Sequence, residues 1–193
     1  GSGKTTLIKI SAGLLTADSG TVCIDKAQVG VYTKAITSYL PDRMALPTEF
    51  TAADAVSLYT DFFADFDRTK ANAMLADLHL NQHDRIGAMS KGTQEKMQLC
   101  LTMSRAAKLY LLDEPLGGVD PAAREYILNT ILHNYSEDAA LVLSTHLIGD
   151  IEKVLDEVIF LKDGSVMRQV GVDELREETG TSVDAYFREA YKC

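Results

Sequence analysis

The chain has 193 residues, of which 46% are hydrophobic and 24% charged, so its length suits one domain, or a domain with a small subdomain, around a packed core. The net charge of −9 argues against a nucleic-acid partner, which needs clustered lysine and arginine, and no apolar run approaches the ~18 residues of a membrane-spanning helix. The three cysteines are widely spaced and without a C-x-x-C pair, so we expect reduced thiols.

The first six residues, Gly1-Ser2-Gly3-Lys4-Thr5-Thr6, predict part of a phosphate-binding loop. Gly3, Lys4 and Thr5 fill the last three positions of the pattern G-x-x-x-x-G-K-[ST], whose first glycine would lie three residues before Gly1. In such a loop the backbone N–H groups and the N-terminus of the following helix bind phosphates. Lys4 would reach the β- and γ-phosphates, and the Thr5 hydroxyl would ligate Mg²⁺. No methionine precedes Gly1, so we expect a C-terminal part of a longer protein, with the strand before the loop and part of the loop missing.

Hydrophobic periodicity predicts an α/β chain with a helical middle. The first elements expected are a helix over Lys4–Leu15 and strands over Thr21–Asp25 and Ile36–Leu40. Helices then follow the capping residues Thr51, Asp67 and Ser90, the first of them in a capping box with Asp54. The stretch 42–107 is therefore expected to form an inserted, all-helical subdomain.

The α/β pattern resumes after this stretch. Buried strands are expected over Leu109–Asp113 and Leu141–Thr145, a helix after Asp120-Pro121, a hairpin over Val158–Lys162 and Val166–Val170, and helices over Val172–Glu178 and Ser182–Tyr191. We therefore assign residues 1–41 and 108–193 to one α/β core that is incomplete at its N-terminus.

The strand Leu109–Asp113 carries the strongest single signal for chemistry. It delivers Asp113 to the carboxyl edge of a sheet, where open α/β sheets bind ligands. There Asp113 can hold Mg²⁺ through water, and Glu114 can polarise a water for attack on a γ-phosphate. A strand that ends in Asp-Glu is also common as a plain acidic turn, so this pair alone leaves both interpretations open.

Five segments in order resemble the motifs of ATP-binding cassette (ABC) ATPases. They are Gly3-Lys4-Thr5 for Walker A, Ser90-Lys91-Gly92-Thr93-Gln94 for the signature, Asp113-Glu114 for Walker B, Gly117-Gly118-Val119-Asp120 for the D-loop and Ser144-Thr145-His146 for the switch histidine. The resemblance covers the whole chain. Its signature and the segment 117–124 are most similar to bacterial exporter-type cassettes, in which the ATPase is a chain separate from its membrane subunit.

This resemblance implies a P-loop NTPase-type parallel sheet flanked by helices, and hydrolysis of ATP with Mg²⁺. It also implies a head-to-tail dimer, with an identical chain or another ABC ATPase, in which each ATP lies between the Walker residues of one protomer and the signature of the other. The partner of the ATPase would be an integral membrane transporter subunit, which would hold it at the cytoplasmic face of the cell membrane.

The residue roles implied by the resemblance follow the motifs. ATP would be bound by the first six residues, Gly1, Ser2, Gly3, Lys4, Thr5 and Thr6, and in trans by Ser90 and Gly92 of the other protomer. The catalytic residues would be Glu114 and His146, and the Mg²⁺ ligands would be Thr5 and Asp113. Asp120 would lie at the dimer interface. His146 would bond the γ-phosphate and orient Glu114. Ser90 also suits an ordinary helix N-cap, and both roles are compatible.

Three departures from the family pattern affect these roles. Lys91 and Thr93 replace a glycine and the glutamine of the usual Leu-Ser-Gly-Gly-Gln signature. Asp42 replaces a glutamine that joins Mg²⁺ to the transporter interface; it is either a third Mg²⁺ ligand or a plain turn residue. The aromatic residue that stacks on adenine would lie before the phosphate loop.

Two other functions compete with the transporter subunit. A soluble cassette ATPase of translation or DNA maintenance is disfavoured by the acidic charge and by the 47 residues between Asp42 and Ser90, which hold no heptads. An inactive fragment is the third possibility. For a transporter subunit, residues 42–87 would supply the docking surface, with Met44, Leu46 and Phe50 as its exposed apolar candidates, although core packing is the commoner fate of such residues.

Overall fold

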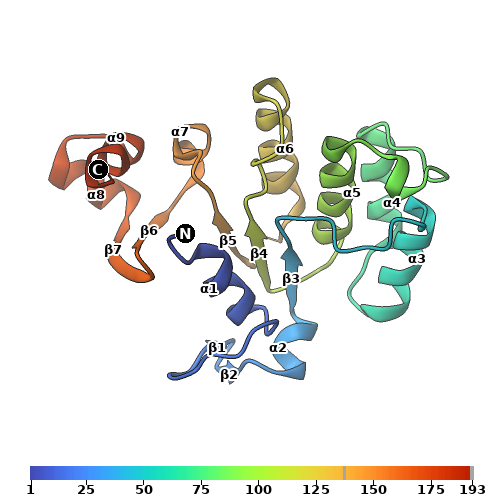
Figure 1. Cartoon of the computed structure of the whole chain (residues 1–193), viewed down its shortest axis with the longest axis horizontal. Helices are drawn as coiled ribbons and strands as arrows, with labels where there is room; N and C mark the ends of the chain where they lie inside the picture. Colours follow the sequence, from blue (N-terminus) through green and yellow to red (C-terminus); the bar gives the residue numbers. More distant parts are fainter. Residues whose placement is uncertain (137, 192–193) are drawn as a thin grey trace.

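We describe a computed structural model that covers residues 1–136 and 138–191, without the side chains of 122 and 123. Its centre is a parallel sheet of β3 (Thr37–Leu40), β4 (Leu109–Asp113) and β5 (Ala140–Ser144), in the order β3-β4-β5 (Figure 1). Leu40 pairs with Leu112, and Asp113 with Ser144, so the carboxyl ends of these strands meet at one edge. The expected α/β fold with a parallel sheet and flanking helices is confirmed.

Helices cover both faces of the sheet because successive side chains of β4 point to opposite sides. Leu111 packs with Ile8 and Ala12 of α1 (Lys4–Ser11). Tyr110 and Leu112 belong to the main core, together with residues of α5 (Lys91–Met103) and α6 (Pro121–Asn134). The continuous apolar run of β4 is therefore explained by burial on both faces.

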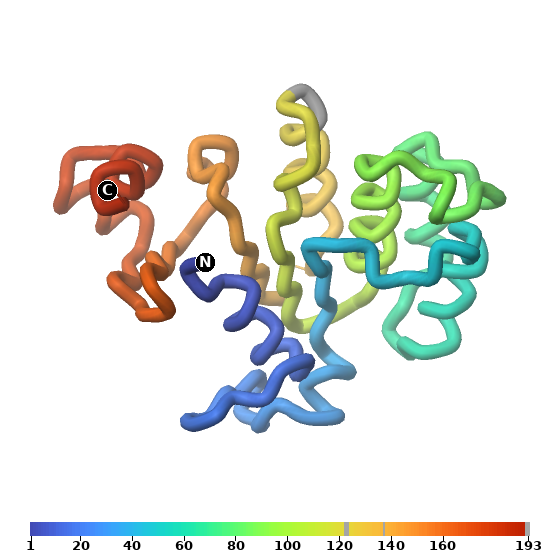
Figure 2. Tube along the Cα trace, viewed as in Figure 1, coloured from blue at the N-terminus to red at the C-terminus, as the bar shows by residue number. Residues whose placement is uncertain are grey.

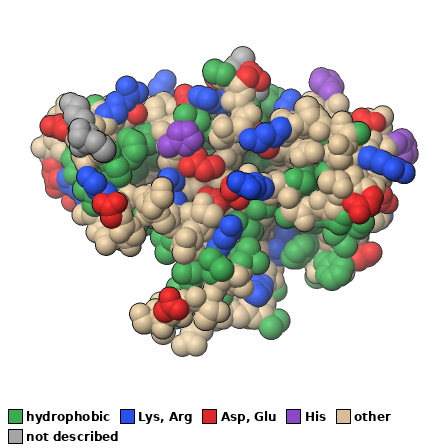
Figure 3. All heavy atoms as spheres, in the orientation of Figure 1, with side chains coloured by type: hydrophobic (Ala, Val, Ile, Leu, Met, Phe, Trp, Pro, Cys, Tyr) green, Lys and Arg blue, Asp and Glu red, His purple; other side chains and the backbone are tan. Residues whose placement is uncertain are grey.

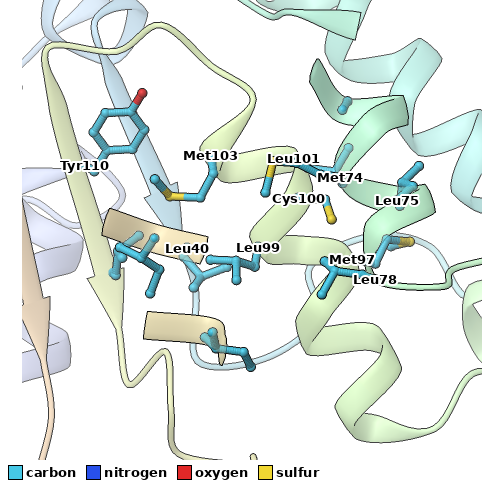
Figure 4. Close-up of a cluster of buried hydrophobic side chains, with 14 of the residues drawn as sticks. Leu40, Met74, Leu75, Leu78, Met97, Leu99, Cys100, Leu101, Met103 and Tyr110 are labelled. Atoms are coloured by element: carbon cyan, nitrogen blue, oxygen red, sulfur yellow. The ribbon is translucent and has the colours of Figure 1, made fainter. Parts of the chain in front are cut away.

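The helical stretch contains α3 (Ala52–Phe62), α4 (Arg68–Asp77), the 3₁₀ turn η1 (Ile86–Ala88) and α5. The Thr51 Oγ1 accepts a hydrogen bond from the Asp54 N–H, and Asp54 accepts one from the Thr51 N–H at 2.9 Å, which is the capping box predicted from the sequence. Buried side chains of α4, α5 and the sheet belong to one hydrophobic cluster, in which those of α4 lie beside α5 (Figure 4). Because α5 packs on β3 as well as on α4, the separate subdomain 42–107 stays a prediction.

The apolar candidates for a docking surface lie against this core. Met44, Leu46 and Phe50 are partly buried and pack onto the main cluster. Among the described residues of the helical stretch, the large apolar side chain that is most exposed is Phe62, at the end of α3. Met44, Leu46 and Phe50 therefore contribute to packing, the commoner fate that we allowed for such residues.

Arg105 joins the helical stretch to the sheet. Its guanidinium is 3% exposed and binds both carboxylate oxygens of Asp65, at 2.9 and 3.0 Å. It also donates to the Thr37 carbonyl at 2.6 Å and lies over the Phe63 ring, 4.0 Å from its centroid. These contacts give a buried charge the pairing that it needs.

The N-terminal arm, residues 12–36, differs from the prediction. Gly13 has a φ of +70°, so α1 ends at Ser11 rather than at Leu15. Residues Asp25 and Lys26, both with positive φ, turn the chain between the two-residue strands β1 (Cys23–Ile24) and β2 (Ala27–Gln28), and α2 (Val31–Ala35) follows. The hairpin was not predicted because its turn has no glycine, and α2 was not predicted because its five residues are too few to show a helical period.

Large apolar side chains are exposed along this arm. They include Leu14, Leu15, Val31 and Tyr32. Figure 3 shows hydrophobic side chains gathered on the part of the molecule that projects downward in that view.

The C-terminal part contains α7 (Ile148–Ile151), η2 (Glu152–Val154), β6 (Glu157–Lys162), β7 (Ser165–Gly171), α8 (Val172–Thr179) and α9 (Val183–Ala190). The antiparallel β6–β7 hairpin and the last two helices are as predicted. Glu152 accepts hydrogen bonds from the backbone N–H groups of Val183 and Asp184 and lies 3.0 Å from Arg176. It therefore caps the start of α9 from outside that helix.

The N-terminus lies between β5 and the β6–β7 hairpin (Figure 2), where the Gly164 N–H donates to the Ser2 carbonyl at 3.3 Å. Within the described residues β5 is paired only with β4, and β6 only with β7. None of the described helices combines the length and the apolar character needed to cross a lipid bilayer. Cys23 is exposed and Cys100 buried, both as free thiols, whereas Cys193 lies outside the described residues.

Candidate nucleotide site

The six N-terminal residues form one wall of a hollow of about 240 Å³, which we call the N-terminal hollow. It is lined by Gly1, Ser2, Gly3, Lys4, Thr5, Thr6 and Glu114. Gly3 has a φ of +95°, which favours glycine, and precedes α1 without any side-chain cap. The first N–H groups of α1 are therefore open toward the hollow, where they can bind an anion.

Asp113 lies behind the lining of the hollow, where it contacts Thr5, and is 1% exposed. Its Oδ1 accepts hydrogen bonds from the Thr5 hydroxyl at 3.1 Å and from the Ser144 hydroxyl at 2.6 Å. Its Oδ2 is buried and has no hydrogen-bond partner among the described residues. An unpartnered carboxylate oxygen beside a threonine hydroxyl fits a hydrated Mg²⁺, which is bound through oxygen ligands and keeps several waters.

Glu114 contacts two residues that the sequence also marks as functional. Its Oε2 lies 3.0 Å from the Nδ1 of His146, and its Oε1 lies 3.7 Å from the Nζ of Lys4. The backbone of Glu114 has a φ of +50°, which is uncommon for a residue with a Cβ. The side chain thereby lines the hollow instead of continuing along the strand.

The signature residues lie away from the N-terminal hollow. Ser90 caps α5, accepting a hydrogen bond from the Thr93 N–H at 3.2 Å. Gly92, in the first turn of α5, faces open space. Neither residue lines the hollow, so this chain does not bring its own signature to its own Walker residues.

Asp42 and Asp120 have less defined positions in the site. Asp42 follows β3, is exposed, and lies 3.9 Å from Arg43. Burial raises the pKa of neighbouring Tyr39 to about 12, and the charges of Asp113 and Asp42 contribute to this rise. Both aspartates therefore raise the pKa of the same phenol. Asp42 does not line the hollow, and its role as a metal ligand stays a prediction. Asp120 is exposed and directly precedes α6.

Two residues that the sequence analysis did not single out belong to these motifs. Ser144 binds both acidic residues of the Walker B segment. Glu95 of α5 packs on the D-loop so closely that a Cβ at Gly118 would lie 1.9 Å from its Oε1. The sequence signal for Ser144 was its place at the end of a strand, two residues before His146. Glu95 gave no signal, because the residue that it contacts, Gly118, is distant in the sequence.

A family model and a relative of known sequence both match this chain to ABC transporter proteins. The family model described as "ABC transporter" matches residues 1–117. The ABC transporter ATP-binding protein YtrB of Bacillus subtilis is 28% identical over 181 residues, which are 92% of this chain and 62% of YtrB. The chain thus spans less than two thirds of that relative's length.

Solved structures agree with this result. One described as the ATP-binding subunit of an ABC transporter has a TM-score of 0.88 at 25% identity, and the match covers 99% of this chain and 84% of that one. A dimeric ATP-binding cassette in a post-hydrolysis state with ADP and Pi has a TM-score of 0.76 at 21% identity, with 88% of this chain and 81% of that chain covered. The second likeness shows the fold alone.

Proposed function

This chain belongs to the ABC transporter family, as its match over residues 1–117 shows, and we propose that it binds and hydrolyses ATP to drive a separate membrane subunit. The observation that carries the proposal is that Lys4 and Glu114 line one hollow and that two further residues contact its lining. His146 lies 3.0 Å from Glu114, and Asp113 accepts a hydrogen bond from Thr5 at 3.1 Å. Three separate segments of the chain supply these residues, and the parallel register of β4 and β5 brings two of these segments together.

The residues of the hollow suit a triphosphate. The backbone N–H groups of Gly3 and the residues after it, together with the Lys4 ammonium, would bind the phosphate oxygens. Thr5 and Asp113 would hold Mg²⁺, which would neutralise the charge of the phosphates when it is bound. Glu114 would accept a proton from the attacking water, and His146 would hold the Glu114 carboxylate in position through the 3.0 Å contact.

We further propose a head-to-tail dimer, formed with a second copy or with another ABC ATPase. The N-terminus of α5, with Ser90 and Gly92, is a second phosphate-binding end that does not reach this chain's own hollow. The similar cassette described as a dimer with ADP and Pi shares the fold of this chain, which is compatible with the pairing of two chains. Residues 1–41 and 108–193 would hold the nucleotide, and residues 42–107 would present the signature to the partner, with Asp120 at the interface.

The membrane partner and the exporter assignment rest on the style of the signature and D-loop segments. In this proposal the ATPase lies at the cytoplasmic face of the membrane, held there by the transporter subunit. The alternative, a soluble cassette ATPase, predicts no such attachment. Cell fractionation distinguishes the two proposals. If the chain drives a transporter, the ATPase should be recovered with membranes and should be released from them when the gene for its membrane partner is deleted.

Phosphate release from ATP, measured over a wide range of concentrations of the full-length protein, tests the enzymatic part. We expect hydrolysis that requires Mg²⁺ and a specific activity that rises with protein concentration, because the active site needs two chains. A full-length protein without ATP-dependent phosphate release at any concentration would contradict the assignment as an ATPase. Specific activity that is constant down to the lowest concentration, where the protein is shown to be monomeric, would contradict the dimer.

A further inference from the structure

We propose that Ser144 is a positioning residue that sets both carboxylates of the site, an inference that rests on the proposed ATPase function. Ser144 is the last residue of β5, is 6% exposed, and pairs with Asp113 across the sheet. Its hydroxyl lies 2.6 Å from Asp113 Oδ1 and 3.0 Å from the backbone nitrogen of Glu114. One buried hydroxyl thus contacts a metal-side carboxylate and the backbone of the proposed base.

The two contacts are compatible because they use different parts of the hydroxyl. A serine hydroxyl has one hydrogen to donate and two lone pairs that accept. Asp113 takes the hydrogen, as a carboxylate oxygen must, and the Glu114 N–H donates to a lone pair. Removing the hydroxyl would therefore remove a donor from Asp113 and an acceptor from Glu114 at the same time.

For Asp113 the loss leaves one side-chain donor. The other hydrogen bond to Oδ1 comes from the Thr5 hydroxyl, which is itself a proposed Mg²⁺ ligand. A hydroxyl that ligates a cation through a lone pair keeps its hydrogen, so Thr5 could still donate to Oδ1, and Ser144 is the second hydroxyl that fixes this oxygen. With Oδ1 held in this way, Oδ2, which is buried and has no hydrogen-bond partner among the described residues, stays available to the hydrated cation.

For Glu114 the effect is on the backbone. The Glu114 N–H donates to both the carbonyl and the hydroxyl of Ser144, at 3.1 and 3.0 Å, and the Glu114 carbonyl accepts from the Gly117 N–H at 2.9 Å. These bonds hold a left-handed conformation, with a φ of +50°, that residues with a Cβ rarely adopt. That conformation directs the carboxylate toward Lys4 and His146.

The chain offers a matched control in Ser38. It is a buried serine on β3, another strand of the same parallel sheet, is 1% exposed, and its hydroxyl donates to the Thr102 carbonyl at 2.8 Å. Ser38→Ala removes a buried hydroxyl of the same sheet without touching either carboxylate. Ser144→Thr keeps the hydroxyl and adds a methyl group that strands tolerate, and Ser144→Cys supplies a weaker donor and acceptor.

The experiment measures binding of Mn²⁺, as a spectroscopic substitute for Mg²⁺, to the full-length protein with ADP by electron paramagnetic resonance. The melting temperature and kcat for ATP are measured in parallel. Ser144→Ala should weaken Mn²⁺ binding about 10–100-fold, as loss of a partner of a metal ligand does. Ser144→Thr should restore most of the affinity, Ser144→Cys should lie between, and Ser38→Ala should lower the melting temperature without changing Mn²⁺ affinity.

Each outcome bears on a definite claim. Equal Mn²⁺ affinity in Ser144→Ala and Ser38→Ala would overturn the positioning role, as would a Ser144→Thr variant that folds but stays as weak as Ser144→Ala. If Ser144→Thr does not melt cooperatively, Ser144→Cys decides by the same comparison. A wild-type protein that binds Mn²⁺ with ADP yet releases no phosphate from ATP would contradict the proposed function and leave the Ser144 measurement intact. Absence of Mn²⁺ binding in the wild type would contradict both.

Discussion

The Nδ1 of His146 lies 3.0 Å from the Oε2 of Glu114, and the other oxygen of that carboxylate lies 3.7 Å from the Lys4 ammonium. One carboxylate is therefore shared between two groups that we assign to the phosphates. When a triphosphate enters, its charge competes for Lys4, which would free one oxygen of Glu114 for a water molecule. The histidine contact does not depend on Lys4 and can keep the carboxylate oriented during this exchange.

Replacement of the proposed base is the most direct test of the site. Glu114→Gln should keep ATP binding and lose hydrolysis, because the amide preserves the shape of the side chain but cannot accept a proton. We expect kcat to fall by about 10²–10⁴-fold. Steady-state phosphate release and ATP titration measure the two parts, with Glu189→Gln on α9 as the control for a changed charge. Turnover within about threefold of wild type would show that Glu114 is not the base, since general base catalysis contributes far more than that.

Lys4→Ala should act on affinity. Lys4 is the full positive charge that we place on the β- and γ-phosphates, and hydrogen bonds to charged groups contribute about 1.5–3 kcal/mol. The Kd for labelled ATP should therefore rise about 10–100-fold in an equilibrium titration. Lys9→Ala, in the last turn of the same helix and outside the hollow, should bind ATP like wild type. Unchanged affinity in Lys4→Ala would assign that lysine to the helix start alone.

Composite sites predict rescue between two impaired variants. Ser90→Arg should block the signature, and Lys4→Ala should impair the phosphate loop, so each variant alone should release little phosphate when ATP is kept well below the raised Kd of Lys4→Ala. A mixed dimer contains one site in which both halves are intact, and phosphate release above that of either parent is expected. The control is each parent at the same total concentration. No rescue, with mixed dimers demonstrated by crosslinking, would argue against sites shared between chains.

The ion pair between Arg105 and Asp65 should contribute more to the free energy of unfolding than an exposed ion pair does. Asp65→Ala leaves a guanidinium that is 3% exposed without its charge partner, and loss of one partner of a buried pair costs about 3–5 kcal/mol. We expect the lower end of that range, because Asp65 itself is partly accessible and Arg105 keeps its carbonyl contacts. Asp173→Ala breaks an exposed pair with Arg176 and should cost less than about 1 kcal/mol. Urea unfolding measures both, and equal effects would contradict this explanation.

The contacts of Glu152 predict that the stability of the C-terminal helices depends on pH. Burial raises the pKa of Glu152, but the N–H groups of Val183 and Asp184 and the Arg176 side chain outweigh it and hold the pKa below the ordinary value of 4.5. Because the folded pKa is the lower one, the stabilisation is fully present above pH 4.5 and is lost as the pH falls through the folded pKa.

Glu152→Gln should remove this dependence. The variant should be less stable than wild type at neutral pH, and the difference should shrink on acidification below pH 4.5. Thermal melts at several pH values measure it, with Glu189→Gln as the exposed control. A difference between Glu152→Gln and wild type that is constant from neutral to acid pH would exclude this carboxylate as the titrating group.

The sequence predicted best where the pattern is local and continuous. The bounds of β4, Leu109–Asp113, and the capping box of Thr51 and Asp54 agree with the structure, because a two-sided buried strand and a helix cap are written in neighbouring residues. The residues around the N-terminal hollow were found because each belongs to a motif with fixed spacing.

What the sequence did not predict depends on contacts between distant residues or on unusual backbone. The turn at Asp25 and Lys26 uses positive φ without glycine, and Arg105 finds Asp65 forty positions away. Ser144 was seen only as a neighbour of His146, because its partners Asp113 and Glu114 are brought to it by the parallel register. Long-range pairing of this kind has no local pattern.

The positive φ of Glu114 determines which residue would be favoured at this position if variants were selected for stability alone. A left-handed conformation costs a residue with a Cβ roughly 1–2 kcal/mol, whereas glycine adopts it freely and loses about 0.5–1 kcal/mol through its greater freedom in the unfolded chain. Glycine at this position would therefore fold about as well as glutamate or better. A library screened for thermostability alone would readily discard the carboxylate, so any engineering of this chain for robustness needs ATP turnover as a second criterion.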